Sequence, residues 1–180
     1  MSANSNALSP LGPTVSSRYR TILTGANLKG LESTLGFSFK DPSILRLALI
    51  HRSFCNENGL DHLECYERLE FLGDAVLELA VSTELFTKFP NSDEGQLTKT
   101  RSSLVCGETL AQVARRMNLG SYLLVGKGVE TSQGRDQDSV LAAAFEALIA
   151  AVYLDQGNEF TRNLILKLLD PELSQIQQAG

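Results

Sequence analysis

The sequence has few of the residues on which structural zinc sites and disulfide frameworks depend. It contains three cysteines and two histidines among 180 residues. The spacing of Cys55, Cys65 and Cys106 matches no zinc-binding template, and three cysteines cannot all pair with one another. We therefore expect reduced thiols, as in a protein of the cytoplasm, although a metal or redox site at these cysteines stays open as the alternative.

Long apolar segments are missing as well. The N-terminus has no apolar run of the kind found in signal peptides. The longest apolar stretch, residues 140–154, contains Glu146 and is shorter than the ~20 residues that a membrane span needs. We expect no membrane contact and interpret this stretch as a buried helix.

Positive charge is scarce. Lysine and arginine number 16 against 21 aspartates and glutamates, which gives a net charge of −5. A surface of this charge does not attract a polyanion in bulk. Nucleic-acid binding would therefore depend on a local basic patch, a metal ion or another domain.

No alternating strand pattern and no internal repeat occurs, so the sequence predicts an all-α fold. Residues 1–17 are rich in Ser, Asn and Pro, which predicts a flexible tail before one domain at 18–180. With 43% hydrophobic residues, that domain can bury a sizeable core.

Capping and breaking residues predict where the helices begin and end. The expected helices begin at Pro42 after Asp41, run from about 67 to 86, begin after Ser92-Asp93, and then span 109–117, 138–154 and 160–169. The glycine-bearing stretch 126–137 is expected to be a loop, and Pro171 is expected to follow the end of the last helix.

The predicted helix at 67–86 has an acidic face. At ~100° per residue, four carboxylates fall within about 80° of one another: Glu67, Glu70, Asp74 and Glu78. A solvated acidic face is one interpretation. However, like charges at this spacing repel and no Lys or Arg interleaves them, so a cation bound across Glu70 and Asp74 is the other. Phe71 lies close to this stripe, and an exposed aromatic there needs a second surface to cover it.

Glu146 is the only charged residue in residues 140–154. An unpaired buried carboxylate is unfavourable, so it must meet an arginine, reach solvent or bind a metal ion. One acid on this helix and an acid pair on another suit an oxygen-ligand site for Mg²⁺.

The segment Glu67-Arg-Leu-Glu-Phe-Leu-Gly-Asp74 resembles the signature of the ribonuclease III family. The resemblance spans residues 28–170, and further similar segments occur in the family's order at 35–54, 92–105, 123–128 and 138–155. It implies an all-helical homodimer with two acidic sites along a cleft. Each site would cut one strand of double-stranded RNA with Mg²⁺, which Mn²⁺ can replace, and leave 5′-phosphate and 3′-hydroxyl ends.

The resemblance also assigns roles to individual residues. Glu70 and Asp74 match the first pair of metal-site carboxylates, and Glu146 matches the last member of the second pair. Glu67 and Glu94 match acids of the same cleft. In the family, the aromatic residue at the position of Phe71 inserts into a pocket of the partner subunit.

Two positions depart from the family pattern. Ala143 stands where the family has a metal-site aspartate, and Tyr66 stands where asparagine is usual. Asp136 and Asp138 lie nearby in sequence, but Asp138 is about 140° around the helix from Ala143 and is a poor substitute. The resemblance therefore implies a site with one carboxylate fewer.

Three residues outside the acidic site have weaker signals. We interpret His51 as a structural hydrogen-bonding residue. Lys127 and Arg135, in or beside the glycine-bearing stretch, could contact RNA phosphates or be solvated loop charges.

The resemblance implies a Mg²⁺-dependent endoribonuclease domain for double-stranded RNA, impaired by Ala143. The alternative is a non-catalytic RNA-binding or scaffold paralogue of the same fold. A helical metal hydrolase acting on small phosphates is a third possibility, but it would not explain Phe71. Many family members carry a C-terminal double-stranded RNA-binding domain, and we expect none within these residues.

Overall fold

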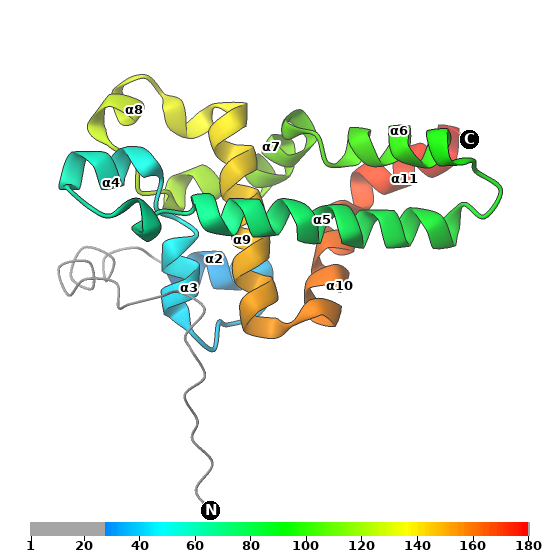
Figure 1. The fold of residues 1–180 in the computed structure, drawn as a ribbon, viewed down its shortest axis with the longest axis horizontal. Helices are drawn as coiled ribbons and strands as arrows, with labels where there is room; N and C mark the ends of the chain where they lie inside the picture. The colour runs from blue at the N-terminus through cyan, green and yellow to red at the C-terminus, as the bar shows by residue number, and fades with distance from the viewer. Residues whose placement is uncertain (1–27, 180) are drawn as a thin grey trace, which may run out of the picture.

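The computed structural model describes residues 28–179, and helices account for nearly all of their regular structure (Figure 1). The α-helices are α2 (Leu28–Leu35), α3 (Pro42–Leu47), α4 (Arg52–Asn58), α5 (Glu67–Lys88), α6 (Glu94–Leu104), α7 (Gly107–Arg116), α8 (Lys127–Thr131), α9 (Asp138–Gln156), α10 (Asn158–Leu168) and α11 (Asp170–Ala179). The 3₁₀ turns are η1 (His62–Glu64), η2 (Leu119–Tyr122) and η3 (Gly134–Asp136).

Within residues 28–179, the only β contact is an isolated bridge between Ile50 and Leu124, so the all-α prediction is confirmed. The tail predicted at 1–17 lies outside the described residues.

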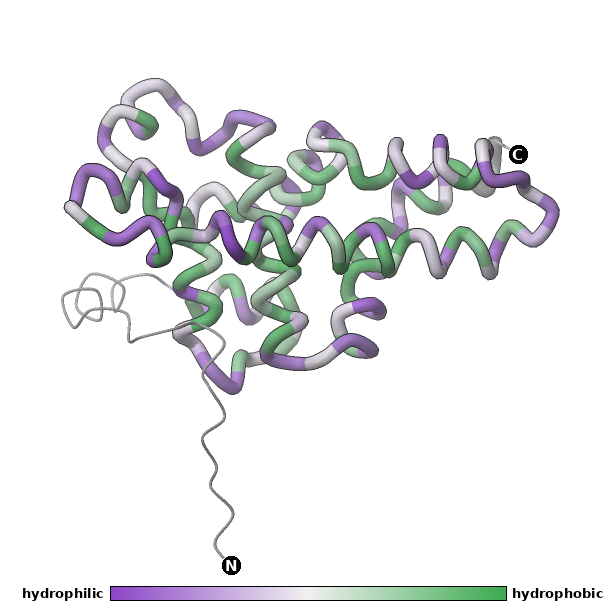
Figure 2. Tube along the Cα trace, in the orientation of Figure 1, coloured by the Kyte–Doolittle hydropathy of each residue, from purple (hydrophilic) through white to green (hydrophobic). Residues whose placement is uncertain are grey.

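Helix α9 is the centre of the core. It contacts α3, α5, α7 and α10, and most of its side chains are buried. Its alanines let neighbouring helices approach closely, and Figure 2 shows the hydrophobic residues that run along it. The apolar stretch at 140–154 is therefore a buried helix, as predicted.

Local capping chemistry determines where several helices begin. The Asp41 carboxylate accepts a hydrogen bond from the Ser43 backbone N–H at 2.9 Å, and Pro42 follows as the first helical residue. At α6, Asp93 and Gln96 form a reciprocal capping box with bonds of 2.8 and 2.9 Å. Each such cap stabilises its helix by about 1 kcal/mol.

The structure corrects several of the predicted boundaries. The loop expected at 126–137 contains α8 and η3, because the Glu57 carboxylate accepts hydrogen bonds from the first backbone N–H groups of α8. A further helix, α11, begins at Asp170, and Pro171 lies in its first turn, where a missing N–H is harmless. Helix α5 extends to Lys88, two residues beyond the predicted end.

The three cysteines are free thiols, with Cys55 and Cys65 buried and Cys106 exposed. This agrees with the expectation of reduced cysteines. In the part of the chain that the structure describes, no helix is both long and apolar enough to span a bilayer.

Candidate active site

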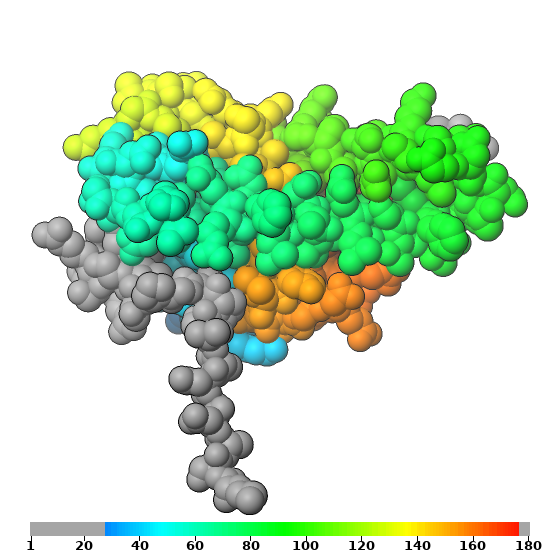
Figure 3. Space-filling model, viewed as in Figure 1, coloured from blue at the N-terminus to red at the C-terminus, as the bar shows by residue number. Residues whose placement is uncertain are grey.

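The site is built where α5 crosses α9, and Gly73 makes that crossing possible. A Cβ atom added at Gly73 would lie 1.8 Å from the backbone oxygen of Glu146 and 2.5 Å from its carbonyl carbon. Only a residue without a side chain permits such an approach. In Figure 3 the atoms of α5 cover the middle of α9, whose two ends emerge on either side. The backbones of the two acidic segments are therefore in direct contact.

The crossing brings three carboxylates together. Glu70 and Asp74 lie one helical turn apart on α5, on either side of Gly73, and Glu146 lies on α9 opposite them. Burial, followed by the charges of Asp74 and Glu70, raises the pKa of Glu146 to about 7. Burial, followed by the charges of Glu67 and Asp74, also raises the pKa of Glu70. The three carboxylates thus repel one another at close range.

No cation of the described chain relieves this repulsion. Among residues 28–179, no Lys, Arg or His forms an ion pair with Glu70, Asp74 or Glu146. The structural alternative for Glu146, an ion pair with an arginine, is therefore absent from this region. Glu67 differs, because Arg52 lies 3.3 Å from its carboxylate.

The donor set matches the ligands that Mg²⁺ prefers, which are carboxylate oxygens completed by water. Within the described part of the chain, however, no three Asp, Glu, His or Cys side chains are already gathered closely enough to enclose an ion. Ala143 contributes no oxygen at its half-buried position on α9. Asp138 cannot replace the missing group, because its carboxylate is paired with Arg115 at 2.6 Å. The ligand type therefore suits Mg²⁺, but the carboxylates of the described residues are not assembled around a cation position in this structure.

Glu94 does not join this cluster within one chain. It is the first residue of α6, and α6 begins at the end of α5 opposite to Glu70 (Figure 1). Its carboxylate accepts a hydrogen bond from the Thr98 hydroxyl at 3.0 Å. Of the two cleft acids expected from the resemblance, only Glu67 lies beside the three carboxylates.

Phe71 is the most exposed large apolar side chain of the described residues, with 81% of its surface accessible. It lies at the edge of a hollow of about 530 Å³. The apolar lining of this hollow is Leu47, Leu63, Leu69, Leu72 and Leu154. An exposed aromatic ring and an apolar hollow therefore lie side by side on one surface, next to the acidic residues.

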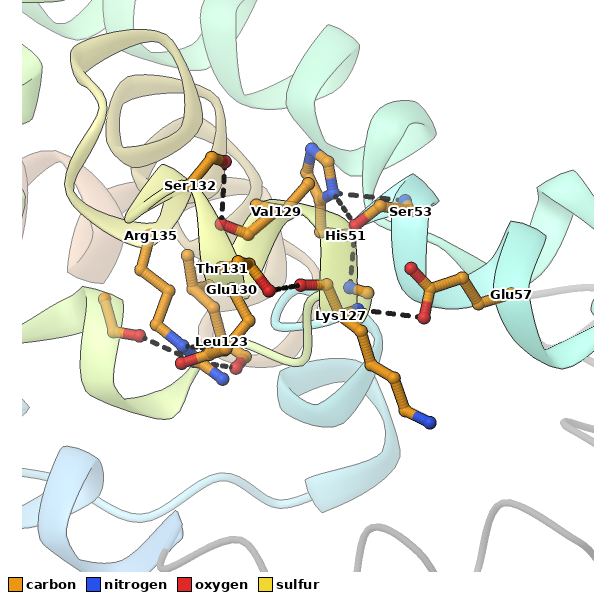
Figure 4. Close-up of polar contacts among 12 residues, drawn as sticks. His51, Ser53, Glu57, Leu123, Lys127, Val129, Glu130, Thr131, Ser132 and Arg135 are labelled. Carbon is orange, nitrogen blue, oxygen red and sulfur yellow. Dashed lines mark hydrogen bonds and ion pairs between the residues drawn. The ribbon is translucent and has the colours of Figure 1, made fainter.

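His51 has a structural role, as predicted from the sequence. Its Nδ1 accepts the Ser53 backbone N–H at 3.1 Å and lies 2.7 Å from the Ser53 hydroxyl, so it caps α4 (Figure 4). The Ser53 hydroxyl also accepts the Gly126 N–H at 2.8 Å. Burial, and then the charge of Arg52, lowers the pKa of His51. A neutral imidazole suits this arrangement, because a protonated Nδ1 could not accept.

The two basic residues near η3, Arg135 and Lys127, differ in whether their side chains already have partners within the chain. The guanidinium of Arg135 donates to the Glu130 carboxylate at 2.6 Å and to the carbonyl oxygens of Gly120 and Leu123. Its Nε and Nη1 donors are thus used inside the chain. Lys127 is exposed, and Figure 4 shows its ammonium group extending away from the neighbouring contacts.

Sequence reasoning missed three features of the site: the role of Gly73, the Arg52–Glu67 ion pair and the Glu57 cap of α8. A signal existed only for Gly73. Glycine inside a helix costs about 1 kcal/mol relative to alanine, so its presence there indicates a packing requirement. The other two contacts join residues that are distant in sequence.

Comparisons with known proteins agree with the resemblance seen in the sequence. The family profile described as Ribonuclease-III-like matches residues 41–173. The chain is 53% identical over 146 residues to Ribonuclease 3 of Pelotomaculum thermopropionicum, covering 81% of this chain and 61% of that protein. It is 46% identical over 151 residues to Ribonuclease 3 of Dehalococcoides mccartyi, covering 84% and 64%. The chain thus spans about three fifths of the length of these curated relatives.

The fold is also similar to a solved structure. The nuclease domain of ribonuclease III from Campylobacter jejuni superposes with a TM-score of 0.75 and 40% identity. The match covers 81% of this chain and 97% of that domain, and a region of that protein is described as involved in dimer formation. The profile, the curated relatives and the fold agree, and the chain belongs to the ribonuclease III family.

Proposed function

We propose that this chain is the nuclease domain of an endoribonuclease that hydrolyses double-stranded RNA, with a divalent cation, Mg²⁺ or Mn²⁺, held by Glu70, Asp74 and Glu146. The observation that carries the proposal is the cluster of three carboxylates at the crossing of α5 and α9 without any cation from the described chain. Folding alone gains nothing from bringing three like charges to one helix crossing, whereas a bound cation would offset their repulsion.

A bound cation would polarise the attacked phosphate and lower the pKa of a water ligand, which is the chemistry that phosphodiester hydrolysis needs. The residues of this chain would hold the site in place. Gly73 keeps α5 against α9, and Arg52 holds Glu67 beside the cluster. The reaction breaks the bond between phosphorus and the 3′ oxygen, so the products carry 5′-phosphate and 3′-hydroxyl ends.

We propose that catalysis is weak, because Ala143 supplies no carboxylate and the Asp138 carboxylate forms an ion pair with Arg115. Losing one fixed group that stabilises transition-state charge costs about 10²–10³ in rate. The same observation favours the second candidate function, a non-catalytic RNA-binding or scaffold protein. The two candidates share the fold and the RNA, and they differ only in whether the site hydrolyses a bond.

We further propose that the active form is a homodimer in which Phe71 enters the apolar hollow of a second copy. The exposed ring and the hollow lie on one surface, as a two-fold symmetric contact requires. RNA phosphates would then meet Lys127 and the cation sites, which would offset the net charge of −5 of the whole chain. The free thiols are consistent with the cytoplasm as the compartment.

The experiment compares four proteins on a labelled RNA duplex with Mn²⁺ or Mg²⁺, analysed on a denaturing gel. They are the chain as it stands, Ala143→Asp, Ala143→Asp combined with Glu70→Gln, and Ala143→Asp combined with Glu78→Gln. Cleavage should be slow in the first, fast in the second and the fourth, and lost in the third. Glu78 is the control, because it is an exposed acid of the same helix outside the cluster. If Ala143→Asp binds the duplex but does not cut it, the scaffold function holds instead.

A further inference from the structure

Helix α8, which carries Lys127, has little packing of its own. It has five residues, and none of them is buried. A helix of this length is unstable in water by itself, because its few hydrogen bonds do not offset the entropy lost in ordering the first turn. The contacts that hold the beginning of α8 come instead from α4. The position of this helix therefore depends on a small number of polar contacts.

Two side chains of α4, one helical turn apart, accept the backbone N–H groups of three consecutive residues. The Ser53 hydroxyl accepts from Gly126 at 2.8 Å. The two oxygens of the Glu57 carboxylate accept from Lys127 at 2.8 Å (Figure 4) and from Gly128 at 3.2 Å. The same two bonds lower the pKa of Glu57, so its carboxylate is ionised and accepts at neutral pH. We call these three hydrogen bonds the α4 latch.

The latch brings the two segments closer together than a side chain at position 126 would allow. A Cβ atom added at Gly126 would lie 2.5 Å from an oxygen of the Glu57 carboxylate and 2.8 Å from the Ser53 backbone oxygen. Packed atoms do not approach one another so closely, so this contact requires glycine. Among the described residues, Glu57 forms no ion pair and no other hydrogen bond, so the latch contains all of its polar contacts.

Lys127 is the cation that the latch holds at the surface. Its backbone N–H donates to Glu57, and its ammonium group extends away from these contacts (Figure 4). Within the described part of the chain, this ammonium group forms no ion pair. The segment after α8 is fixed independently, because Arg135 donates to the Glu130 carboxylate at 2.6 Å. Without the latch, the first turn of α8 would lose its polar contacts with α4, so Lys127 would no longer be held at one position.

We propose that Glu57 is a positioning residue, whose carboxylate holds Lys127 where it meets the phosphates of bound RNA. The contact with RNA rests on the proposed function, whereas the latch itself does not. A positioning role differs in sign from a simple effect of charge. An acid that acts through its charge alone weakens the binding of a polyanion, and its removal strengthens binding. Removing an acid that positions a cation weakens binding instead.

Binding of a labelled RNA duplex, measured by fluorescence anisotropy over a range of salt concentrations without divalent cations, tests this sign. Glu57→Ala should weaken binding by about two- to fivefold, even though it removes a negative charge. Lys127→Ala should weaken binding and lower the slope of log affinity against log salt concentration by about 1. In the Lys127→Ala background, Glu57→Ala should have no further weakening effect, because no cation is left to position.

Glu159→Ala is the matched control for the change in charge. Glu159 is an exposed acid in the first turn of α10, and its carboxylate forms no ion pair with the described residues. Its removal changes the net charge as much as Glu57→Ala does, and it should leave binding equal or slightly tighter. If Glu57→Ala binds the duplex as tightly as Glu159→Ala does, the proposal is overturned.

Amide hydrogen exchange in the RNA-free protein tests the latch itself. The informative amides are those of Glu130 and Ser132, which donate to the carbonyl oxygens of Gly126 and Gly128 and not to Glu57. Their exchange should become about tenfold faster in Glu57→Ala, since the loss of two hydrogen bonds lets α8 open more often. Unchanged exchange at both amides would show that α8 keeps its position without Glu57, and the proposal would be wrong.

Gly126→Ala disrupts the latch without changing any charge. The added methyl group would displace the Glu57 carboxylate, so this variant should weaken RNA binding and speed the exchange of α8, as Glu57→Ala does. A Gly126→Ala protein that matches the unchanged chain in both measurements contradicts the latch. If the unchanged chain binds no duplex at all, the proposed function fails and the positioning role fails with it. The exchange measurement then still decides whether Glu57 holds α8.

Discussion

Replacing Gly73 by alanine should separate the two helices that carry the acidic site. The added methyl group would lie 1.8 Å from the Glu146 backbone oxygen, and an ordinary contact begins at about 3.4 Å. The backbones must therefore move apart by roughly 1.5 Å. A neighbouring flexible side chain could rotate out of the way, but the atoms in contact here belong to the backbone of α9, so the whole crossing has to shift.

The expected loss of stability follows from two opposing effects. Inserting a methyl group into a packed core costs about 1–3 kcal/mol, and a backbone clash belongs at the upper end of this range or above it. A gap of 0.5–1 Å already removes about a quarter to a half of the attractive energy of each van der Waals contact between α5 and α9. Alanine in place of glycine returns about 1 kcal/mol of helix propensity. We expect a net destabilisation of about 2–3 kcal/mol for Gly73→Ala.

Urea unfolding followed by circular dichroism measures this difference, and Gly95→Ala is the matched control. Gly95 lies in the first turn of α6, and its added Cβ would meet only the Asp93 carboxylate, at 3.4 Å. The control should be neutral or slightly stabilised, by at most about 1 kcal/mol. A Gly73→Ala protein as stable as the unchanged chain would show that α5 and α9 are not in direct backbone contact.

Three further outcomes are expected. Ala143→Asp should bind Mn²⁺ about tenfold more tightly by calorimetry because it adds a charged ligand, and equal affinity would argue against the placement of the cation. Phe71→Ala should shift a dimer to monomer in sedimentation, since each buried ring contributes about 1.5–3 kcal/mol, whereas a monomeric unchanged chain at tens of micromolar would contradict the homodimer. Glu146→Gln should be more stable than the unchanged chain at pH 8 by about 1 kcal/mol, allowing for partial exposure, and equal to it near pH 4.5. The reason is that burial and Asp74 raise the pKa of Glu146 from 4.5 to about 7, so the folded protein favours its neutral form. The contribution of this neutral form to the free energy of unfolding is complete below pH 4.5 and is lost as the pH rises through 7.

The sequence predicted those parts of the fold that depend on neighbouring residues. Asp41 with Pro42, and Asp93 with Gln96, begin their helices where the capping pattern indicated. Helix α9 was predictable because its apolar run is long enough for a helix and too short to span a membrane. Capping and periodicity act within one or two turns, and a single sequence contains that information.

The errors arose where a distant residue decides the local structure. Glycines at 126, 128 and 134 suggested a loop, but Glu57, about 70 residues earlier, accepts the N–H groups that begin α8. Pro171 suggested an end of helical structure, yet it lies in the first turn of α11, where proline is tolerated. The Arg52–Glu67 ion pair likewise joins two helices. Spacing alone does not reveal such pairs.

For the site, the helical wheel placed Glu70 and Asp74 on one acidic face and left open whether that face is solvated or binds a cation. Four like charges without an interleaved cation were the signal, and the structure adds Glu146 to the pair on α5 while leaving all three without a cation of the described chain. What the wheel could not supply was the distance between helices, which depends on Gly73. The resemblance named the residues, and the packing explains why they meet.

For the proposed cation site, alanine in place of an aspartate at position 143 would change the balance between folding and cation binding. Burial and two neighbouring carboxylates already raise the pKa of Glu146 to about 7, so ionising it opposes folding when no cation is bound. A fourth carboxylate on the same face of α9, one turn from Glu146, would add to this repulsion and would make the folded state depend more strongly on a cation. With alanine at this position, the metal-free protein avoids that repulsion, and it also loses one oxygen ligand. Stability without metal and affinity for metal would therefore be opposed at the proposed site, and Ala143 would favour the former.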